Sequence, residues 1–130
     1  MDNHDVLVVD DDDAVRAVTS EMLVRLGYTV VTAEDGARAL RSLAENEVQV
    51  VLLDLSMPGL SGFEVYEALR RSGNSVHVVF MTGYASSEVD ELVAADSGVG
   101  VLTKPFPLQE LKDSIENALL LGGYSSMVEP

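Results

Sequence analysis

Val48-Gln49-Val50-Val51-Leu52-Leu53-Asp54-Leu55-Ser56-Met57-Pro58-Gly59 is the stretch with the strongest fold signal in the chain. It begins as a nearly continuous run of Val and Leu, which is typical of a parallel strand buried on both faces of a sheet. The run meets one carboxylate, Asp54, and then breaks at Met57-Pro58-Gly59. Because open α/β sheets bind ligands at the carboxyl ends of their strands, we expect Asp54 to lie at a functional edge.

Outside this stretch, apolar or β-branched runs alternate with segments of helical periodicity. The predicted strands cover residues 6–9, 29–33, 48–54, 76–81 and 99–102, and the predicted helices cover residues 14–26, 36–43, 62–71, 86–95 and 107–121. Strict alternation predicts a doubly wound, five-stranded parallel sheet with helices on both faces, an α/β fold of the flavodoxin-like (βα)5 kind. The first, third and fourth strands are the most apolar and are expected at the centre, which favours the strand order 2-1-3-4-5.

The helix ends carry recognisable signals. Asp13 is predicted to be the N-cap of the first helix and Gly27 its C′ residue. Helical periodicity predicts that the buried positions of the first, fourth and last helices include Val18, Val93 and Leu108 respectively. The glycine pair 122–123 is expected to end the last helix, so residues 1–121 are predicted to form one domain and residues 122–130 a C-terminal tail or linker.

Composition indicates a single domain and argues against disulfide-rich, membrane-spanning and nucleic-acid-binding proteins. The chain has 130 residues, 47% of them hydrophobic, which suits one ordinary domain. Without cysteine it offers no disulfide or thiolate metal site, and no apolar run reaches the ~20 residues of a membrane helix. No signal peptide is visible, so a cytoplasmic protein is expected. Eight basic against 22 acidic residues give a formal charge of -14, which argues against direct nucleic-acid binding and suits a divalent cation or a basic partner.

Polar residues end four of the predicted strands and are expected to converge at one edge of the sheet: Asp10 and Asp11, Asp54, Thr82, and Lys104. Three carboxylates brought together raise at least one carboxyl pKa unless a cation intervenes. Magnesium prefers oxygen ligands of this kind, and an aspartate can act as a nucleophile toward a phosphoryl group. The pattern therefore predicts magnesium-assisted phosphoryl transfer onto Asp54. Asp12 and Asp13 are interpreted as solvated or capping residues, although a shift of the aspartates by one position stays open.

The chain resembles the receiver domain of two-component response regulators, which are CheY-like proteins, from Val6 to about Leu121. The resemblance rests on four motifs in order, Val8-Val9-Asp10-Asp11, Leu53 to Gly59, Met81-Thr82-Gly83 and Thr103-Lys104-Pro105-Phe106. It implies a phosphorylation-controlled signalling switch. Such a domain takes its phosphoryl group from a histidine kinase or a histidine phosphotransfer protein and catalyses only its own phosphorylation and dephosphorylation.

The resemblance also implies a role for each matching residue. Asp54 would be the phosphoacceptor, Lys104 would pair with it or with its phosphoryl group, and Thr82 would move toward the phosphoryl oxygen. Mg²⁺ would be bound directly by Asp11, Asp54 and the backbone carbonyl of Ser56, and through water by Asp10. The Lys104-Pro105 peptide bond would be cis.

One position departs from the family pattern. Receivers usually carry Tyr or Phe three residues before the lysine, whereas this chain carries Val101. Because a short β-branched side chain has few rotamers, we expect the response to phosphorylation to use residues 83–87 and to leave the fifth strand little changed. A monomer or a weak homodimer is expected.

Three other functions fit the sequence less well. A phosphatase of the haloacid dehalogenase type also uses an aspartate nucleophile and magnesium, but it carries a second aspartate where this chain has Ser56, and the chain is too short for a cap domain. A flavin-binding electron carrier would need a phosphate-binding loop where this chain has four aspartates, residues 10–13. A purely structural receiver is disfavoured, since none of the expected site residues is missing.

Overall fold

The structure, a computed structural model, describes residues 2–84 and 86–128. Five parallel strands form one sheet in the order β2-β1-β3-β4-β5, which confirms the predicted topology. The strands are β1 (Asp2–Val9), β2 (Val30–Ala33), β3 (Asn46–Asp54), β4 (His77–Thr82) and β5 (Val99–Thr103). The helices are α1 (Asp13–Arg25), α2 (Gly36–Glu45), α3 (Gly62–Arg71), α4 (Ser87–Ala95) and α5 (Leu108–Val128).

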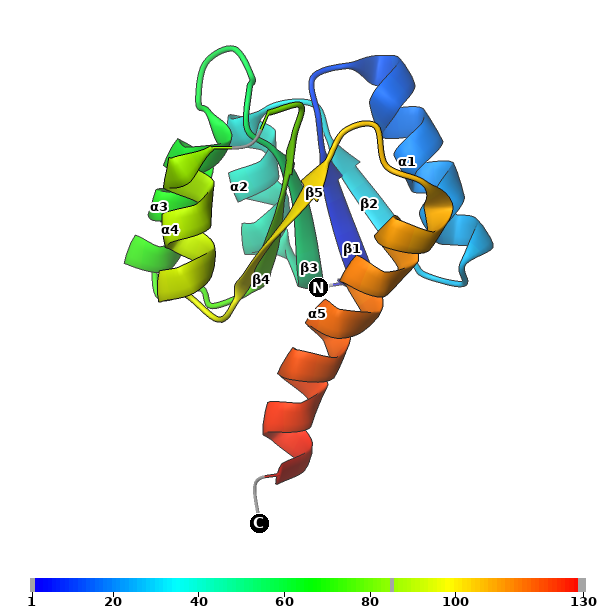
Figure 1. Cartoon of the computed structure of the whole chain (residues 1–130), viewed down its shortest axis with the longest axis vertical. Helices are drawn as coiled ribbons and strands as arrows, with labels where there is room; N and C mark the ends of the chain where they lie inside the picture. Colours follow the sequence, from blue (N-terminus) through cyan, green and yellow to red (C-terminus); the bar gives the residue numbers. More distant parts are fainter. Residues whose placement is uncertain (1, 85, 129–130) are drawn as a thin grey trace.

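The helices cover both faces of the sheet, as Figure 1 shows: α2, α3 and α4 lie on one face, and α1 and α5 on the other. Each face has its own hydrophobic core. Alternate side chains of β1, such as Leu7 and Val8, point into opposite cores, and β3 does the same with Leu53 and Leu52. All four side chains are fully buried, which explains why the central strands read as unbroken apolar runs.

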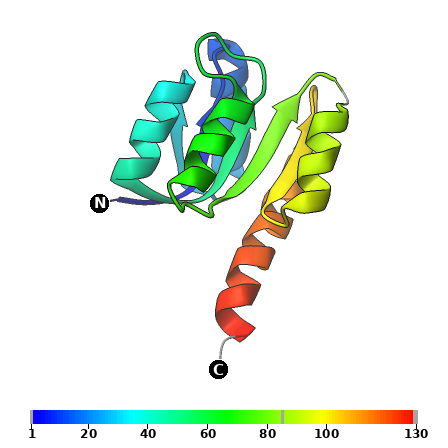
Figure 2. The same cartoon turned by 90° about the vertical axis from the view of Figure 1, so that its left-hand side faces the viewer.

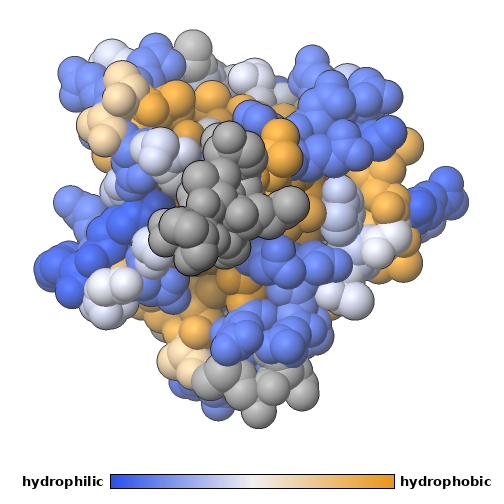
Figure 3. All heavy atoms as spheres, turned by 90° about the horizontal axis from the view of Figure 1, so that it is seen from below, coloured by the Kyte–Doolittle hydropathy of each residue, from blue (hydrophilic) through white to orange (hydrophobic). Residues whose placement is uncertain are grey.

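Helix α5 is the longest helix and its last turns extend past the sheet, as Figures 1 and 2 show. Figure 3 looks at the edge where the strands begin, and there hydrophobic atoms (orange) are interspersed with hydrophilic atoms (blue). Within the described residues, no helix is both long enough and apolar enough to cross a lipid bilayer.

Several helix details differ from the sequence-based predictions. Asp12, not Asp13, caps α1, because its carboxylate accepts hydrogen bonds from the backbone N–H groups of Ala14 and Val15. The inward face of α1 carries Thr19 and Leu23, whereas Val18 is 57% exposed. Periodicity defines a stripe on a helix, but the angle at which the helix meets the sheet decides which edge of the stripe is buried.

The same reason applies at two other positions, because Val93 and Leu108 are exposed where burial was predicted. The prediction that residues 122–123 end the last helix is also wrong, since α5 continues to Val128. Glycine lowers helix propensity by about 1 kcal/mol per residue without by itself ending a helix. The proposed domain boundary at residue 121 stays a prediction.

Candidate functional site

The site lies where β1 and β3 end side by side. Val9 is the register partner of Leu53, so the next residues, Asp10 and Asp54, lie at the same level where the two strands end. This is the position in the strand order at which the chain reverses direction across the sheet. Both side chains are almost fully buried, and they are the only buried carboxylates among the described residues.

Lys104 joins these two carboxylates. It follows β5, and its ammonium group lies 2.8 Å from Oδ2 of Asp10 and 3.3 Å from Oδ1 of Asp54. Burial alone would lower the pKa of Lys104, but the hydrogen bond and charge of Asp10, together with the charge of Asp54, raise it. Lys104 therefore stays protonated and keeps one positive charge beside the aspartates.

The carboxyl group of Asp54 is harder to ionise than an ordinary aspartate. Burial and the neighbouring charge of Asp10 raise its pKa from 3.8 to about 6, although Lys104 and the backbone N–H of Ser56 favour the charged form. That N–H lies 3.4 Å from Oδ1 of Asp54. The positive charge of Lys104 therefore does not fully compensate the burial of Asp54 and the negative charge of Asp10. A second cation at this position would favour the ionised form of Asp54.

Asp11 completes an acidic cluster at the surface of the site. One carboxylate oxygen each from Asp10, Asp11 and Asp54 can be chosen so that all three lie within 4.8 Å of one another. Asp11 is exposed, so the cluster opens to solvent on one side. Three carboxylate oxygens in this arrangement fit a hard divalent cation such as Mg²⁺, which keeps several of its waters. Asp12 and Asp13 are not members of this cluster.

Thr82 lies at the end of β4, where its hydroxyl is engaged with the following loop. The hydroxyl donates to the carbonyl oxygen of Tyr84 at 2.9 Å and accepts from the N–H of Tyr84 at 3.1 Å. The register pairs Thr82 with Thr103, which places Lys104 just beyond it. The peptide bond between Lys104 and Pro105 is cis, as the resemblance implied. The structure thus brings Thr82 to the same edge as the acidic cluster.

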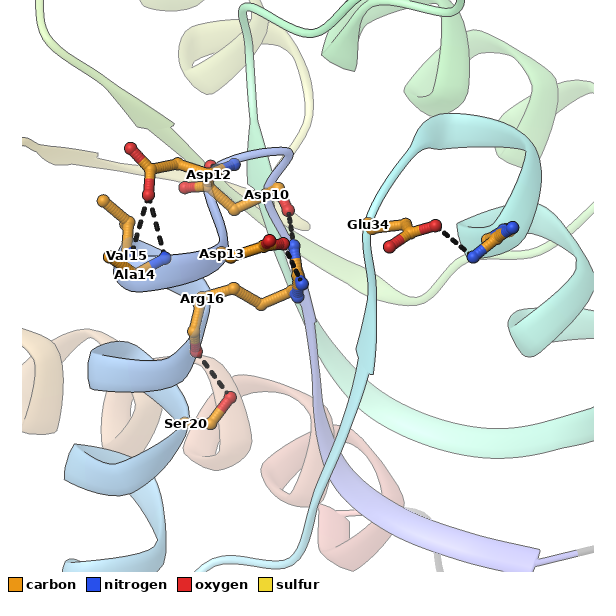
Figure 4. A network of polar contacts seen from close by, with 9 residues as sticks. Asp10, Asp12, Asp13, Ala14, Val15, Arg16, Ser20 and Glu34 are labelled. Atoms are coloured by element: carbon orange, nitrogen blue, oxygen red, sulfur yellow. Dashed lines mark hydrogen bonds and ion pairs between the residues drawn. The ribbon is translucent and has the colours of Figure 1, made fainter.

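Arg16 is a residue near the site that the sequence did not single out. Its guanidinium donates to the backbone carbonyl of Asp10 at 2.7 Å and pairs with Asp13 at 2.5 Å, as Figure 4 shows. The N–H of Asp12 also donates to Oδ1 of Asp10 at 2.9 Å. These contacts tie the loop of four aspartates to the first turn of α1 and orient the Asp10 carboxylate. A basic residue one turn into the predicted helix was the available sequence signal.

Gly62 is a second residue whose role only the structure reveals. A Cβ atom at this position would lie 2.5 Å from the carbonyl oxygen of Asp54 and 2.9 Å from Cα of Leu55. The absence of a side chain allows the start of α3 to pack directly against the end of β3. Ser61 and Glu64 form a capping box at the same place and so begin the helix there.

Comparison with known proteins identifies this arrangement. Residues 6–116 match the family described as the response regulator receiver domain. A transcriptional regulatory protein, PrrA of Mycobacterium tuberculosis, is 46% identical over 123 residues, which cover 93% of this chain and 52% of that protein. Sporulation initiation phosphotransferase F of Bacillus subtilis is 31% identical over 124 residues, which cover 93% of this chain and 98% of that protein.

A solved structure agrees with these relatives. The response regulator TrrA of Thermotoga maritima, in complex with Mg(2+)-BeF, is 32% identical, and the match covers 92% of this chain and all of that one with a TM-score of 0.77. The chain spans about half the length of several curated relatives it matches, including PrrA. Those longer relatives therefore carry further segments that have no counterpart in this alignment.

Proposed function

The chain belongs to the family of response regulator receiver domains of two-component systems, whose function is phosphoryl transfer to an aspartate, and on this premise we propose that its phosphoacceptor is Asp54. The observation that carries the proposal is the ammonium group of Lys104 lying between two buried carboxylates, with a third carboxylate open to solvent beside them. Asp54 is the member of that group that lies at the end of the central strand β3.

In the proposed reaction, a carboxylate oxygen of Asp54 attacks the phosphorus of a phosphohistidine. The new O–P bond forms as the P–N bond breaks, and the departing imidazole nitrogen keeps the electron pair. Lys104, 3.3 Å from Asp54, offsets the negative charge that the phosphoryl group brings. The hydroxyl of Thr82 is a donor that can leave the carbonyl of Tyr84 and bond to a phosphoryl oxygen.

Mg²⁺ is the proposed cofactor, since three carboxylate oxygens cluster there and the pKa of Asp54 is raised to about 6. Asp11, Asp54 and the backbone carbonyl of Ser56 would hold the ion directly, and Asp10 would hold it through water. A bound Mg²⁺ supplies positive charge that offsets the charge of the transferring phosphoryl oxygens. The buried Asp10 is held in place by Lys104 and by the N–H of Asp12.

A histidine kinase or a histidine phosphotransfer protein is the proposed donor. The chain would act on no substrate other than its own aspartate, and so would serve as a switch rather than as an enzyme with turnover. The cytoplasm is the proposed compartment, in keeping with a chain that has no cysteine.

Intact-mass analysis after incubation with acetyl phosphate tests the assignment. We expect the mass of one phosphoryl group to be added in the presence of Mg²⁺, and no addition in EDTA or in Asp54→Asn. The matched control is Asp12→Asn, which keeps an N-cap residue outside the acidic cluster and should label like wild type. Equal labelling of Asp54→Asn and wild type would reject Asp54 as the phosphoacceptor.

A further inference from the structure

A groove between α3 and α4 lies on the same face of the sheet as α2 and is separate from the acidic cluster at the strand ends. Its volume is about 500 Å³. The apolar floor is formed by Phe63, Leu92 and the edge of Tyr66, and the rim carries Glu67 from α3 and Glu88 and Glu91 from α4. No basic side chain lines this groove in the part of the chain that the structure describes.

The floor of the groove is built on the core and is therefore preformed. The ring of Phe63 lies 5.5 Å from that of Phe80, and the ring of Tyr66 lies 5.7 Å from the same residue. The hydroxyl of Tyr66 donates to Asp96 at 2.6 Å, which fixes the far end of the ring. Arg70 lies over the ring of Tyr66, 4.9 Å from its centroid, and already pairs with Asp96 at 2.9 Å. Among the described residues, the three rim glutamates therefore have no basic side chain beside them in the lining of the groove.

The chemistry of the groove selects its occupant. The rim glutamates are not among the acidic groups of the described residues that lie close enough together to hold one metal ion. A Lys or Arg side chain fits both the apolar floor and the acidic rim of the groove, because its methylene groups cover apolar surface while its charge reaches the glutamates. We propose that this groove docks a basic, amphipathic segment of a partner protein, with Lys or Arg at the glutamates and an apolar residue on the floor.

A second copy of this chain is a poorer occupant. Five of the eight Lys and Arg residues, Arg16, Arg25, Arg38, Arg70 and Lys104, already form ion pairs within the described residues. Each copy also carries a formal charge of -14, so two copies repel one another. The partner is therefore a different, basic protein.

The groove is connected to the phosphorylation site through the start of α4. Ser86 caps this helix by accepting from the N–H of Glu88 at 3.2 Å, and Thr82 holds the preceding turn through Tyr84. If Thr82 turns to a phosphoryl oxygen, its bonds to Tyr84 break and the start of α4, with Glu88, shifts. Phosphorylation thus changes the affinity of the groove, and this step rests on the proposed function.

Fluorescence anisotropy with a labelled amphipathic Lys/Leu peptide tests the docking. The double variant E88Q/E91Q should weaken binding roughly three- to thirtyfold, as expected for the loss of two partly exposed charge pairs. The control E110Q/E116Q removes the same charge from α5 and should change affinity by less than about twofold. E67Q, on α3, provides a second rim variant that leaves the first turn of α4 intact, and circular dichroism checks that each variant is folded.

If both double variants weaken peptide binding equally, the peptide is attracted only by the net charge of the protein, and the proposed docking site is overturned. Self-association that E88Q/E91Q abolishes would overturn it in favour of a second copy. For the coupling, affinity is measured with and without Mg²⁺ and beryllofluoride, and labelling by acetyl phosphate is measured separately. An unchanged affinity in a protein that labels normally would reject the coupling and leave the docking, whereas failure to label would reject the coupling together with the proposed function.

Discussion

At the scale of single residues, the main feature of this protein is the acidic cluster, in which one lysine contacts two buried carboxylates. Asp10 and Asp54 are buried side by side, and Lys104 contacts both. Burial, and after it the neighbouring charge of Asp10, raises the pKa of Asp54 to about 6. A group with a raised carboxyl pKa stabilises the fold only while it is protonated, so the folded domain gives up stability in order to hold Asp54 ionised at neutral pH.

The pH dependence of stability follows with a definite sign. Folding raises the pKa of Asp54 from 3.8 to about 6, so its stabilising contribution is present below pH 3.8 and is lost as the pH rises through about 6. In EDTA at neutral pH, Asp54→Asn should therefore increase the free energy of unfolding by about 1–3 kcal/mol. Urea unfolding over a pH series measures this, and the curves of variant and wild type should converge at low pH. A difference independent of pH would contradict the assigned cause.

Mg²⁺ should raise the free energy of unfolding of the wild-type domain. An ion that binds only the folded state adds about 2.7 kcal/mol at a hundredfold excess over its Kd. Asp11→Asn should lose most of this increment, because Asp11 is the open member of the acidic cluster. Asp12→Asn is the matched control, since Asn also caps helices and Asp12 lies outside the cluster. Thermal melts of both variants with and without Mg²⁺ measure the stabilisation that each retains. A larger loss in Asp12→Asn than in Asp11→Asn would mean that Asp12 is the ligand.

At the scale of elements, the site depends on how closely α3 approaches the end of β3. Gly62 permits this approach, because any Cβ there would meet the backbone of Asp54 and Leu55. At the other end of α3, Arg70 donates to the carbonyl oxygens of Asn74 and Val76 and pairs with Asp96, which connects the helix to the segment before β4 and to the turn before β5. Helix α3 is thus held at both ends, and the position of Asp54 depends on it.

Gly62→Ala should therefore lower both stability and labelling. The inserted methyl group meets backbone atoms, which cannot rotate away, so we expect a loss of about 1–3 kcal/mol in the free energy of unfolding. Labelling by acetyl phosphate should fall as well, because Asp54 is displaced. Gly100→Ala is the control, since its Cβ would meet only Val79 and His77 at 3.7 and 3.8 Å, which is ordinary contact. Similar losses in both variants would show that the effect of Gly62 is not steric.

At the scale of the whole molecule, the charge is strongly asymmetric. Acidic residues outnumber basic ones by 22 to eight, and five of the basic residues are already paired internally within the described residues. The surface that remains is therefore largely anionic. Such a surface keeps copies of the chain apart and favours basic partners.

We accordingly predict a monomer at low ionic strength. Sedimentation velocity should give a single species of monomer mass, and added salt should permit at most weak self-association, since screening shortens the reach of the repulsion. A tight dimer at low salt would contradict this prediction. It would mean that apolar contact, for example at Val101 or Leu120, outweighs the net charge.

The local pattern of this sequence contains enough to predict the strand order and the residues that end each strand. The run from Val48 to Leu53 has the apolar continuity of a central strand, and Asp10, Asp54 and Lys104 follow runs whose ends must meet at one edge of a parallel sheet. Alternation and turn residues are local properties, so the chain carries them without reference to distant contacts. The exposure of Val18 and the continuation of α5 through residues 122–123 depend instead on how whole helices dock and how far they persist. The contact of Gly62 with Asp54 and the anchoring of Asp10 by Arg16 likewise arise from packing between elements, and only the tertiary structure decided them.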